Sequence, residues 1–171
     1  MTALTVTDHR PERDPGPFRD VLANHPSGVT IVTAADPQTL EPSGLVVTAF
    51  SSVSADPPMV LVCLDQGSVT LATIQRSGSF TVNFLASGRE PLVSLFSSKR
   101  SDKFGDVQWH FPAAGGGPVL IDDVCGYLAC VLVDEITVGD HRICLGRVEE
   151  VQYLPDRAPL VYHQRGFTSV G

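Results

Sequence analysis

Small hydroxyl side chains are concentrated in one short segment of the chain, Ser43 to Pro58, which reads SGLVVTAFSSVSADPP. They follow an opening glycine and belong to Thr48, Ser51, Ser52 and Ser54. Small side chains on an extended backbone leave N–H and O–H donors accessible, so this strand edge suits an anionic or heteroaromatic ligand. The same residues also fit an ordinary edge strand with a serine-rich turn, and both interpretations stay open.

Two further segments carry groups that could bind or react. Residues 97–104, SSKRSDKF, form the dense basic patch of an acidic chain, for which a solvated loop is the alternative. His141 follows Gly139-Asp140 at a predicted tight turn, where a lone histidine is most often simply exposed. The sequence lacks zinc-type histidine spacing, a C-x-x-C pair and a G-x-S-x-G motif, which disfavours metalloenzymes and hydrolases. We therefore expect no metal site.

Short strands and a few helices would position these groups. Apolar spacing predicts helices over 18–24, 67–77 and 90–96, the second capped by Ser68 or Thr70. Strands are predicted over 28–34, 44–53, 59–64, 79–85 and 158–167, and as a long hairpin within 124–151. Strand 59–64 is apolar throughout and is expected to be buried on both faces at the barrel centre. The order lacks βαβ alternation, so it predicts an antiparallel barrel with helical decorations.

Bulk properties limit the class of protein. A length of 171 residues fits one domain, which we place at 17–171 after a flexible tail over 1–16. The net charge of -7 argues against a nucleic-acid partner. Without a signal-like start or an apolar run near ~20 residues, we expect a cytoplasmic protein without membrane contact. The cysteines are expected to be buried free thiols, and the glycine-rich segment 113–118 a flexible loop without a phosphate role.

Six motifs occur in a recognisable order between Phe18 and Phe167: PSGVTIVT, GLVVTAFSSVSADPPMVLVCL, FTVNFL, LFSSKRSDKF, VGDHRICLGRV and PLVYH. By these motifs the chain resembles the flavin reductases built on the FMN-binding split barrel, which supply reduced flavin to two-component monooxygenases. The resemblance implies a mainly β, antiparallel split β-barrel of Greek-key-like type with a few short peripheral helices. It also implies a homodimer, FMN or FAD as the flavin, NADH or NADPH as co-substrate, and a flavin-dependent monooxygenase as partner.

The resemblance also suggests which residues bind. The flavin-lining stretch corresponds to Val46, Val47, Thr48, Ala49, Phe50, Ser51 and Ser52. The phosphate-binding groups would be Ser68, Thr70, Ser98, Lys99, Arg100 and Lys103, with Phe104 packing against the ring. Asn83 matches a position beside the flavin, although a mid-strand asparagine satisfied by neighbouring backbone explains it equally well. The nicotinamide nucleotide would contact His141, Tyr162 and Arg165, with a partner subunit as one source of the last two.

The expected reaction is hydride transfer from the nicotinamide nucleotide to the flavin, which needs positioning and no catalytic side chain. Two features depart from the family pattern: Val46 and Thr48 replace the usual threonine and asparagine or serine, and Gln164 separates His163 from Arg165. The first alternative is a flavin-binding electron carrier without efficient NAD(P)H oxidation. A pyridoxamine-phosphate-oxidase-like enzyme is a weaker alternative, because the ordered motifs fit flavin reductases better.

Overall fold

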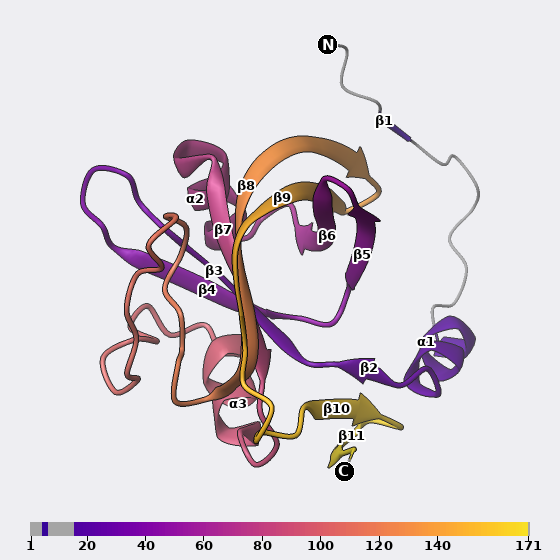
Figure 1. Ribbon diagram of the computed structural model, residues 1–171. Helices are drawn as coiled ribbons and strands as arrows, with labels where there is room; N and C mark the ends of the chain where they lie inside the picture. The colour runs from indigo at the N-terminus through magenta and orange to yellow at the C-terminus, as the bar shows by residue number, and fades with distance from the viewer. Residues whose placement is uncertain (1–4, 7–15, 171) are drawn as a thin grey trace.

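Figure 1 shows the chain as a computed structural model, which describes residues 5–6 and 16–170. Its helices are α1 (Gly16–Ala23), α2 (Val69–Ser77) and α3 (Glu90–Ser97). Its strands are β1 (Thr5–Val6), β2 (Ser27–Gly28), β3 (Thr30–Ala35), β4 (Pro42–Val47), β5 (Phe50–Ala55), β6 (Pro58–Asp65), β7 (Ser79–Leu85), β8 (Val124–Val138), β9 (His141–Tyr153), β10 (Leu160–His163) and β11 (Gly166–Ser169). Most of the predicted tail over 1–16 lies outside the described residues.

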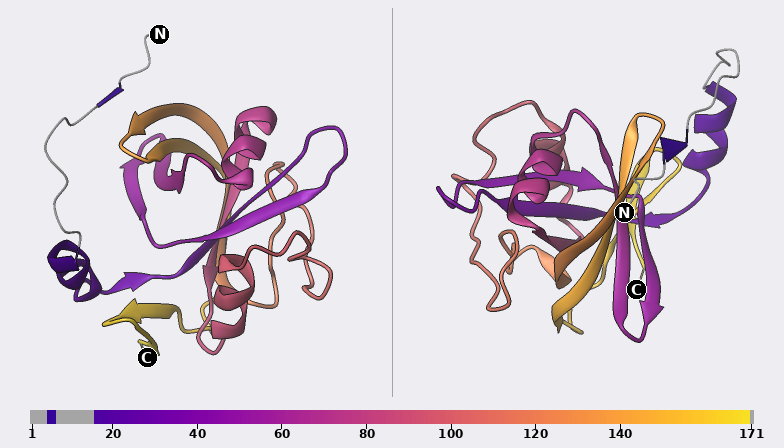
Figure 2. Two further views of the ribbon diagram at one scale, coloured as in Figure 1. Left: turned by 180° about the vertical axis from the view of Figure 1, so that it is seen from behind. Right: turned by 90° about the horizontal axis from the view of Figure 1, so that it is seen from above.

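The main sheet runs in the order β4-β3-β7-β8-β9-β6-β5, and neighbouring strands along it are antiparallel. The long hairpin of β8 and β9 bends strongly, so that the sheet curls around its own core (Figures 1 and 2). A small second sheet joins β11, β10 and β2, and β1 pairs in parallel with the end of β8. The predicted antiparallel split β-barrel with a few short helices is confirmed.

The core has two parts, and β3 separates them. Every residue of β3 is buried, and successive side chains point to opposite faces of a strand. Val32 joins a cluster inside the curl of the sheet with Phe80 and Ile74, whereas its neighbour Ile31 packs on the other face with Phe96. β3 is therefore buried on both faces. The expectation for strand 59–64 was wrong: β6 alternates in burial and lies one strand from the edge of the sheet.

The hydroxyl-rich segment is divided between two strands, where a single strand over 44–53 was expected. β4 pairs with β3, and β5 pairs with β6, so the two lie at opposite edges of the main sheet. Thr48 and Ala49 form the corner between them, where the Phe50 N–H donates to the Thr48 carbonyl at 3.0 Å. The two small residues Thr48 and Ala49 thus connect the two edge strands of the main sheet.

The end of the segment 113–118 is packed onto the sheet, where a flexible loop was expected throughout, whereas residues 113–115 are exposed. A Cβ on Gly117 would lie 2.2 Å from the Thr33 carbonyl carbon and oxygen, so only glycine fits there. The Thr33 hydroxyl donates to the Pro118 carbonyl at 2.7 Å, and the Thr81 hydroxyl donates to the Gly117 carbonyl at 2.8 Å. Buried threonines therefore supply the hydrogen bonds that this segment's backbone requires.

None of the helices in the described part of the chain has both the length and the hydropathy needed to span a membrane.

Candidate functional site

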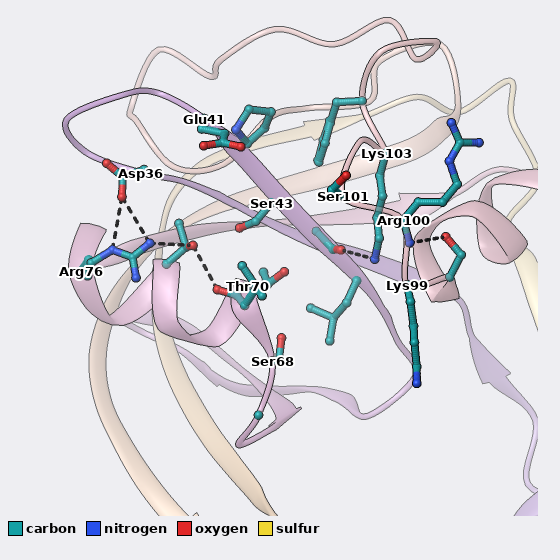
Figure 3. A pocket seen from close by; sticks show the side chains of 18 residues that line it. Asp36, Glu41, Ser43, Ser68, Thr70, Arg76, Lys99, Arg100, Ser101 and Lys103 are labelled. Carbon is teal, nitrogen blue, oxygen red and sulfur yellow. Dashed lines mark hydrogen bonds and ion pairs between the residues drawn. The ribbon is translucent and has the colours of Figure 1, made fainter.

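A cavity of about 640 Å³ lies between β4, α2 and the segment that follows α3 (Figure 3). α2 packs on β3 and β4, and α3 packs on β4, so this strand forms the floor between the two helices. The lining residues are Asp36, Glu41, Pro42, Ser43, Gly44, Leu45, Gly67, Ser68, Val69, Thr70, Thr73, Arg76, Ser98, Lys99, Arg100, Ser101, Lys103 and Phe104. The volume is within the range of small-molecule sites.

The charge in this cavity is opposite to that of the whole chain. Among the described residues, the cationic side chains that line it are Arg76, Lys99, Arg100 and Lys103, against the carboxylates of Asp36 and Glu41. The sequence has only 12 Lys and Arg residues and a net charge of -7, so a third of its basic residues line one cavity. Such a concentration of positive charge attracts an anionic ligand.

The start of α2 provides polar groups to the same cavity. Ser68 is the N-cap residue, and its hydroxyl oxygen accepts a hydrogen bond from the Leu71 N–H at 3.4 Å. A hydroxyl that accepts in this way keeps its own hydrogen available for a ligand. The positive end of the helix dipole points toward the same place. Thr70 lines the cavity but is only 3% exposed, so it contributes mainly to the wall.

Lys103 is held in a fixed position, which a solvated loop would not provide. Its ammonium donates to the Phe96 carbonyl at 2.8 Å and to the Gly44 carbonyl at 3.3 Å. These bonds connect the segment 98–104 to the end of α3 and to β4. Partial burial lowers the pKa of Lys103 because the charged form loses hydration. An ammonium has three N–H donors, so one remains for a ligand in the cavity.

Phe104 is part of both the cavity wall and the core. It is 8% exposed, and its ring meets Phe96 edge-on with the centroids 5.1 Å apart. A Cβ on Gly44 would lie 2.9 Å from Phe96 Cε1 and 3.2 Å from Phe104 Cζ, so the bare glycine makes room for both rings. Asp102 fixes the backbone at Phe104 and Gly105 by accepting from their N–H groups at 3.2 and 2.8 Å.

The predicted flavin-lining stretch begins just beyond the part of β4 that lines the cavity. The lining residues of this strand are Pro42 to Leu45, whereas the prediction named the next seven residues. Of those seven, Val47 is buried, Val46 and Phe50 are half-buried, and Thr48, Ala49, Ser51 and Ser52 are exposed. The Phe50 ring packs edge-on against Phe84, with centroids 5.0 Å apart. The exposed members do not line the cavity; they belong to the corner and the strand β5, which follow the lining part of β4 along the chain.

Asn83 has a structural role and does not line the cavity. It has no exposed surface, and its amide donates to the Ile31 and Pro118 carbonyls at 3.3 and 3.1 Å and to the Thr33 hydroxyl at 3.2 Å. Its oxygen accepts from the Leu120 N–H at 3.0 Å. All of its hydrogen-bonding atoms are thus used to hold residues 118–120 against β3. These contacts fit the alternative, a strand asparagine satisfied by its neighbours, and the assignment of Asn83 as a flavin neighbour stays a prediction.

His141 is the first residue of β9 and lies opposite Asp65 in the register with β6. Its side chain is 47% exposed, and Nδ1 lies 2.7 Å from Asp140 Oδ1. The Gln66 N–H donates to the Asp140 carbonyl at 3.0 Å, so this hairpin is bonded to the turn that leads into Ser68. His141 is therefore exposed near the turn that leads into Ser68, at the start of α2.

Tyr162 and Arg165 are in a different part of the chain from His141. They belong to the hairpin of β10 and β11 in the small second sheet, beside β2. The Tyr162 ring packs against Phe167 with centroids 5.5 Å apart, and Arg165 forms an ion pair with Asp20 of α1. One copy of the chain does not bring these two residues together with His141 around the cavity.

Sequence reasoning missed several lining residues, above all Asp36, Glu41, Thr73 and Arg76. Thr70, Thr73 and Arg76 follow one another at intervals of three residues, which places them on one face of a helix. That spacing was visible in the sequence. No local pattern connects Asp36 and Glu41 to this face, because the contact depends on how α2 packs on β3 and β4.

Comparisons with known proteins agree with this architecture. The model of the flavin reductase like domain matches residues 22–171. A flavin reductase (NADPH) from Lentzea aerocolonigenes is 37% identical over 96% of this chain and 89% of its own. The reductase component of a 4-nitrophenol 4-monooxygenase/4-nitrocatechol 2-monooxygenase from Rhodococcus opacus is 39% identical over 90% of this chain and 80% of its own.

A solved structure has the same fold. The NADH:FAD oxidoreductase SgcE6 of Streptomyces globisporus C-1027, in complex with NAD and FAD fragments, superposes with a TM-score of 0.84 at 28% identity. The match covers 95% of this chain and 98% of that one. The family model, the two relatives and this structure each match most of the chain, which therefore belongs to the family of flavin reductase like domains.

Proposed function

We propose that this chain is an NAD(P)H:flavin oxidoreductase that binds FMN or FAD and reduces it with NADH or NADPH. The observation that carries the proposal is the cationic cavity of an acidic protein, whose floor strand β4 leads into the exposed small residues Thr48, Ala49, Ser51 and Ser52. Cationic side chains bind phosphate groups, and exposed small residues suit a heteroaromatic ring with polar edges. The names of the relatives support the same activity.

The donors in the cavity fit the phosphate of a flavin nucleotide. Lys103 offers one remaining N–H from a fixed ammonium, Ser68 offers its hydroxyl hydrogen, and Lys99 and Arg100 add exposed positive charge. When bound, the flavin supplies the hydride-accepting atom. The chain holds the phosphate, orients the ring along residues 48–52 and limits the access of water. None of these tasks requires a nucleophile.

His141 is the proposed contact for the nicotinamide nucleotide. It is exposed next to the turn of Ser68, and its hydrogen bond lowers the pKa of Asp140. This bond keeps the imidazole oriented at the mouth of the β8–β9 hairpin. Tyr162 and Arg165 join the same site only if they come from a second copy of the chain.

We further propose that the chain acts as a homodimer and delivers reduced flavin to a flavin-dependent monooxygenase. No residue of α1 is buried, and its apolar residues Phe18, Val21 and Leu22 are exposed by 51% or more. A second copy could cover them. The relative from Rhodococcus opacus is named as a monooxygenase component, which supports the partner. All four cysteines are free thiols, as expected for a protein in the reducing cytoplasm.

The test is steady-state oxidation of NADH and NADPH by the purified protein with FMN or FAD under air. We expect saturable oxidation that depends on both protein and flavin. If no combination exceeds the rate without protein, the reductase proposal fails. Flavin binding in the same preparation would then identify the carrier alternative. Light scattering on the same sample measures the oligomeric state, and a monomer at assay concentration would refute the dimer.

A further inference from the structure

The cavity continues past its phosphate-binding residues to an end of different chemistry. Asp36 and Glu41, from the connection between β3 and β4, lie there with Arg76, from the last turn of α2 (Figure 3). They are across the cavity from the segment 98–104. Arg76 is seven residues beyond the first residue of α2, which corresponds to about 10 Å along the helix axis. Binding of a flavin phosphate leaves the two carboxylates at this end without a role.

Arg76 presents a fixed guanidinium plane to this end of the cavity. Nε donates to Asp36 Oδ2 at 3.2 Å, and Nη2 donates to the Thr73 hydroxyl at 3.2 Å. Asp36 is itself fixed, because Oδ1 accepts from the Gln38 and Thr39 N–H groups at 3.0 and 3.2 Å. Guanidinium hydrogen bonds lie in the plane of the group, so they occupy its edges and leave its faces free. The side chain is 53% exposed, and such a face stacks well on an aromatic ring.

Glu41 adds a hydrogen-bond acceptor beside that plane. Its side chain is exposed, lines the cavity and has no hydrogen bond to any other described residue. A carboxylate accepts hydrogen bonds from ribose hydroxyls and from exocyclic amines. Together Asp36, Glu41 and Arg76 leave this end with one excess negative charge, which repels an additional phosphate. The end therefore favours an aromatic base with an unmodified ribose.

We infer that this end of the cavity binds the adenosine part of a dinucleotide, with Arg76 stacked on the adenine and Glu41 bonded to the ribose. The phosphates of the same molecule lie toward the segment 98–104. FAD and NADH both carry this group, whereas FMN lacks it and NADPH carries an extra phosphate on its ribose. The inference rests on the proposed function and names a binding subsite within the same cavity.

Two matched variants test the subsite. Arg76→Gln removes the proposed stacking group, and Arg89→Gln removes a comparable surface arginine that pairs with Asp123 at 3.2 Å and does not line the cavity. We expect Arg76→Gln to raise KM for FAD or for NADH about fivefold relative to KM for FMN, the effect of losing one cation–π contact. A raised KM for FAD identifies FAD as the source of the adenosine, and a raised KM for NADH identifies NADH as the source. Equal KM values in the two variants for both dinucleotides would overturn the inference.

Binding of ADP, measured by calorimetry, gives a test that does not depend on turnover. The wild-type protein should bind ADP more tightly than Arg76→Gln and about as tightly as Arg89→Gln. Glu41→Lys should improve the use of NADPH relative to NADH if the adenosine comes from the nicotinamide nucleotide, and should leave that ratio unchanged if it comes from FAD. A protein that binds ADP but oxidises neither nucleotide would refute the proposed reductase and support this subsite. Loss of ADP affinity to the same extent in both arginine variants would refute the subsite alone.

Discussion

Replacing Lys103 by methionine keeps the length of the side chain and removes its charge, so it separates the two tasks of this residue. A charge-assisted hydrogen bond contributes about 1.5–3 kcal/mol. Because the ammonium is only partly buried, we take the lower end, which corresponds to a roughly tenfold weaker flavin affinity. The variant also leaves the Phe96 and Gly44 carbonyls without their donor. For about 2 kcal/mol of lost stability, the melting temperature should fall by about 4–8 °C in a chain of this length.

Lys99→Met is the matched control, since Lys99 lines the same cavity but is exposed and fixed by no hydrogen bond among the described residues. Flavin dissociation constants from fluorescence titration and melting temperatures should be measured for both variants. We expect Lys103→Met to lose more affinity and more stability than Lys99→Met. A flavin affinity equal to that of the wild type, with a lowered melting temperature, would show that Lys103 is purely structural and would refute its role in phosphate binding.

Three further predictions concern other residues and conditions. Because burial lowers the pKa of Lys103, flavin affinity should fall as the pH rises through a value below the pKa of free lysine. The free energy of unfolding should rise slightly over the same pH range, because the unfolded state binds more protons there. Titrations of Lys103→Met should lack both changes. Asn83→Ala should lower the free energy of unfolding by about 2 kcal/mol, because it leaves the buried Leu120 N–H without an acceptor, whereas the Pro118 carbonyl keeps the Thr33 hydroxyl as a donor. Urea denaturation measures this loss, and a variant as stable as the wild type with a raised KM for flavin would instead support the predicted flavin contact of Asn83. His141→Ala should raise KM for NADH about fivefold, as expected for one lost hydrogen bond, and should change flavin affinity less. Steady-state kinetics equal to those of the wild type would show that His141 does not contact the nucleotide.

The sequence predicts the elements well where a local signal is strong. Ser68, one of the two predicted capping residues, is the N-cap of α2, and the helix ends at Gly78 in the left-handed conformation at φ 70°. The predicted turn at Gly139 joins β8 to β9. The structure of the segment 44–53 was harder to predict, because its hydroxyl and β-branched residues suit a strand throughout. Its division at Thr48 depends on the pairing of β5 with β6, which no local pattern specifies.

Long-range packing also explains what sequence reasoning missed in the site. Asn83 looks like a polar ligand group in isolation, but its partners Pro118 and Leu120 come from a segment more than thirty residues away that glycines made look flexible. The carboxylate of Asp36 meets Arg76 across 40 positions of sequence. Residues near β4 and after α3 could be named from their motifs. The residues at the acidic end of the cavity could not be named from motifs, because only the packing of α2 on the sheet brings them together.

Reduction of flavin in a single turnover without oxygen tests the central claim most directly. The purified protein would be mixed with FMN or FAD and then with NADH or NADPH, while flavin absorbance is followed. We predict loss of the oxidised flavin band at a rate that depends on the protein, and a slower rate when the transferred hydrogen of the nicotinamide is deuterium. Flavin that binds to the protein but stays oxidised with both nucleotides would contradict the account and leave this chain a flavin carrier.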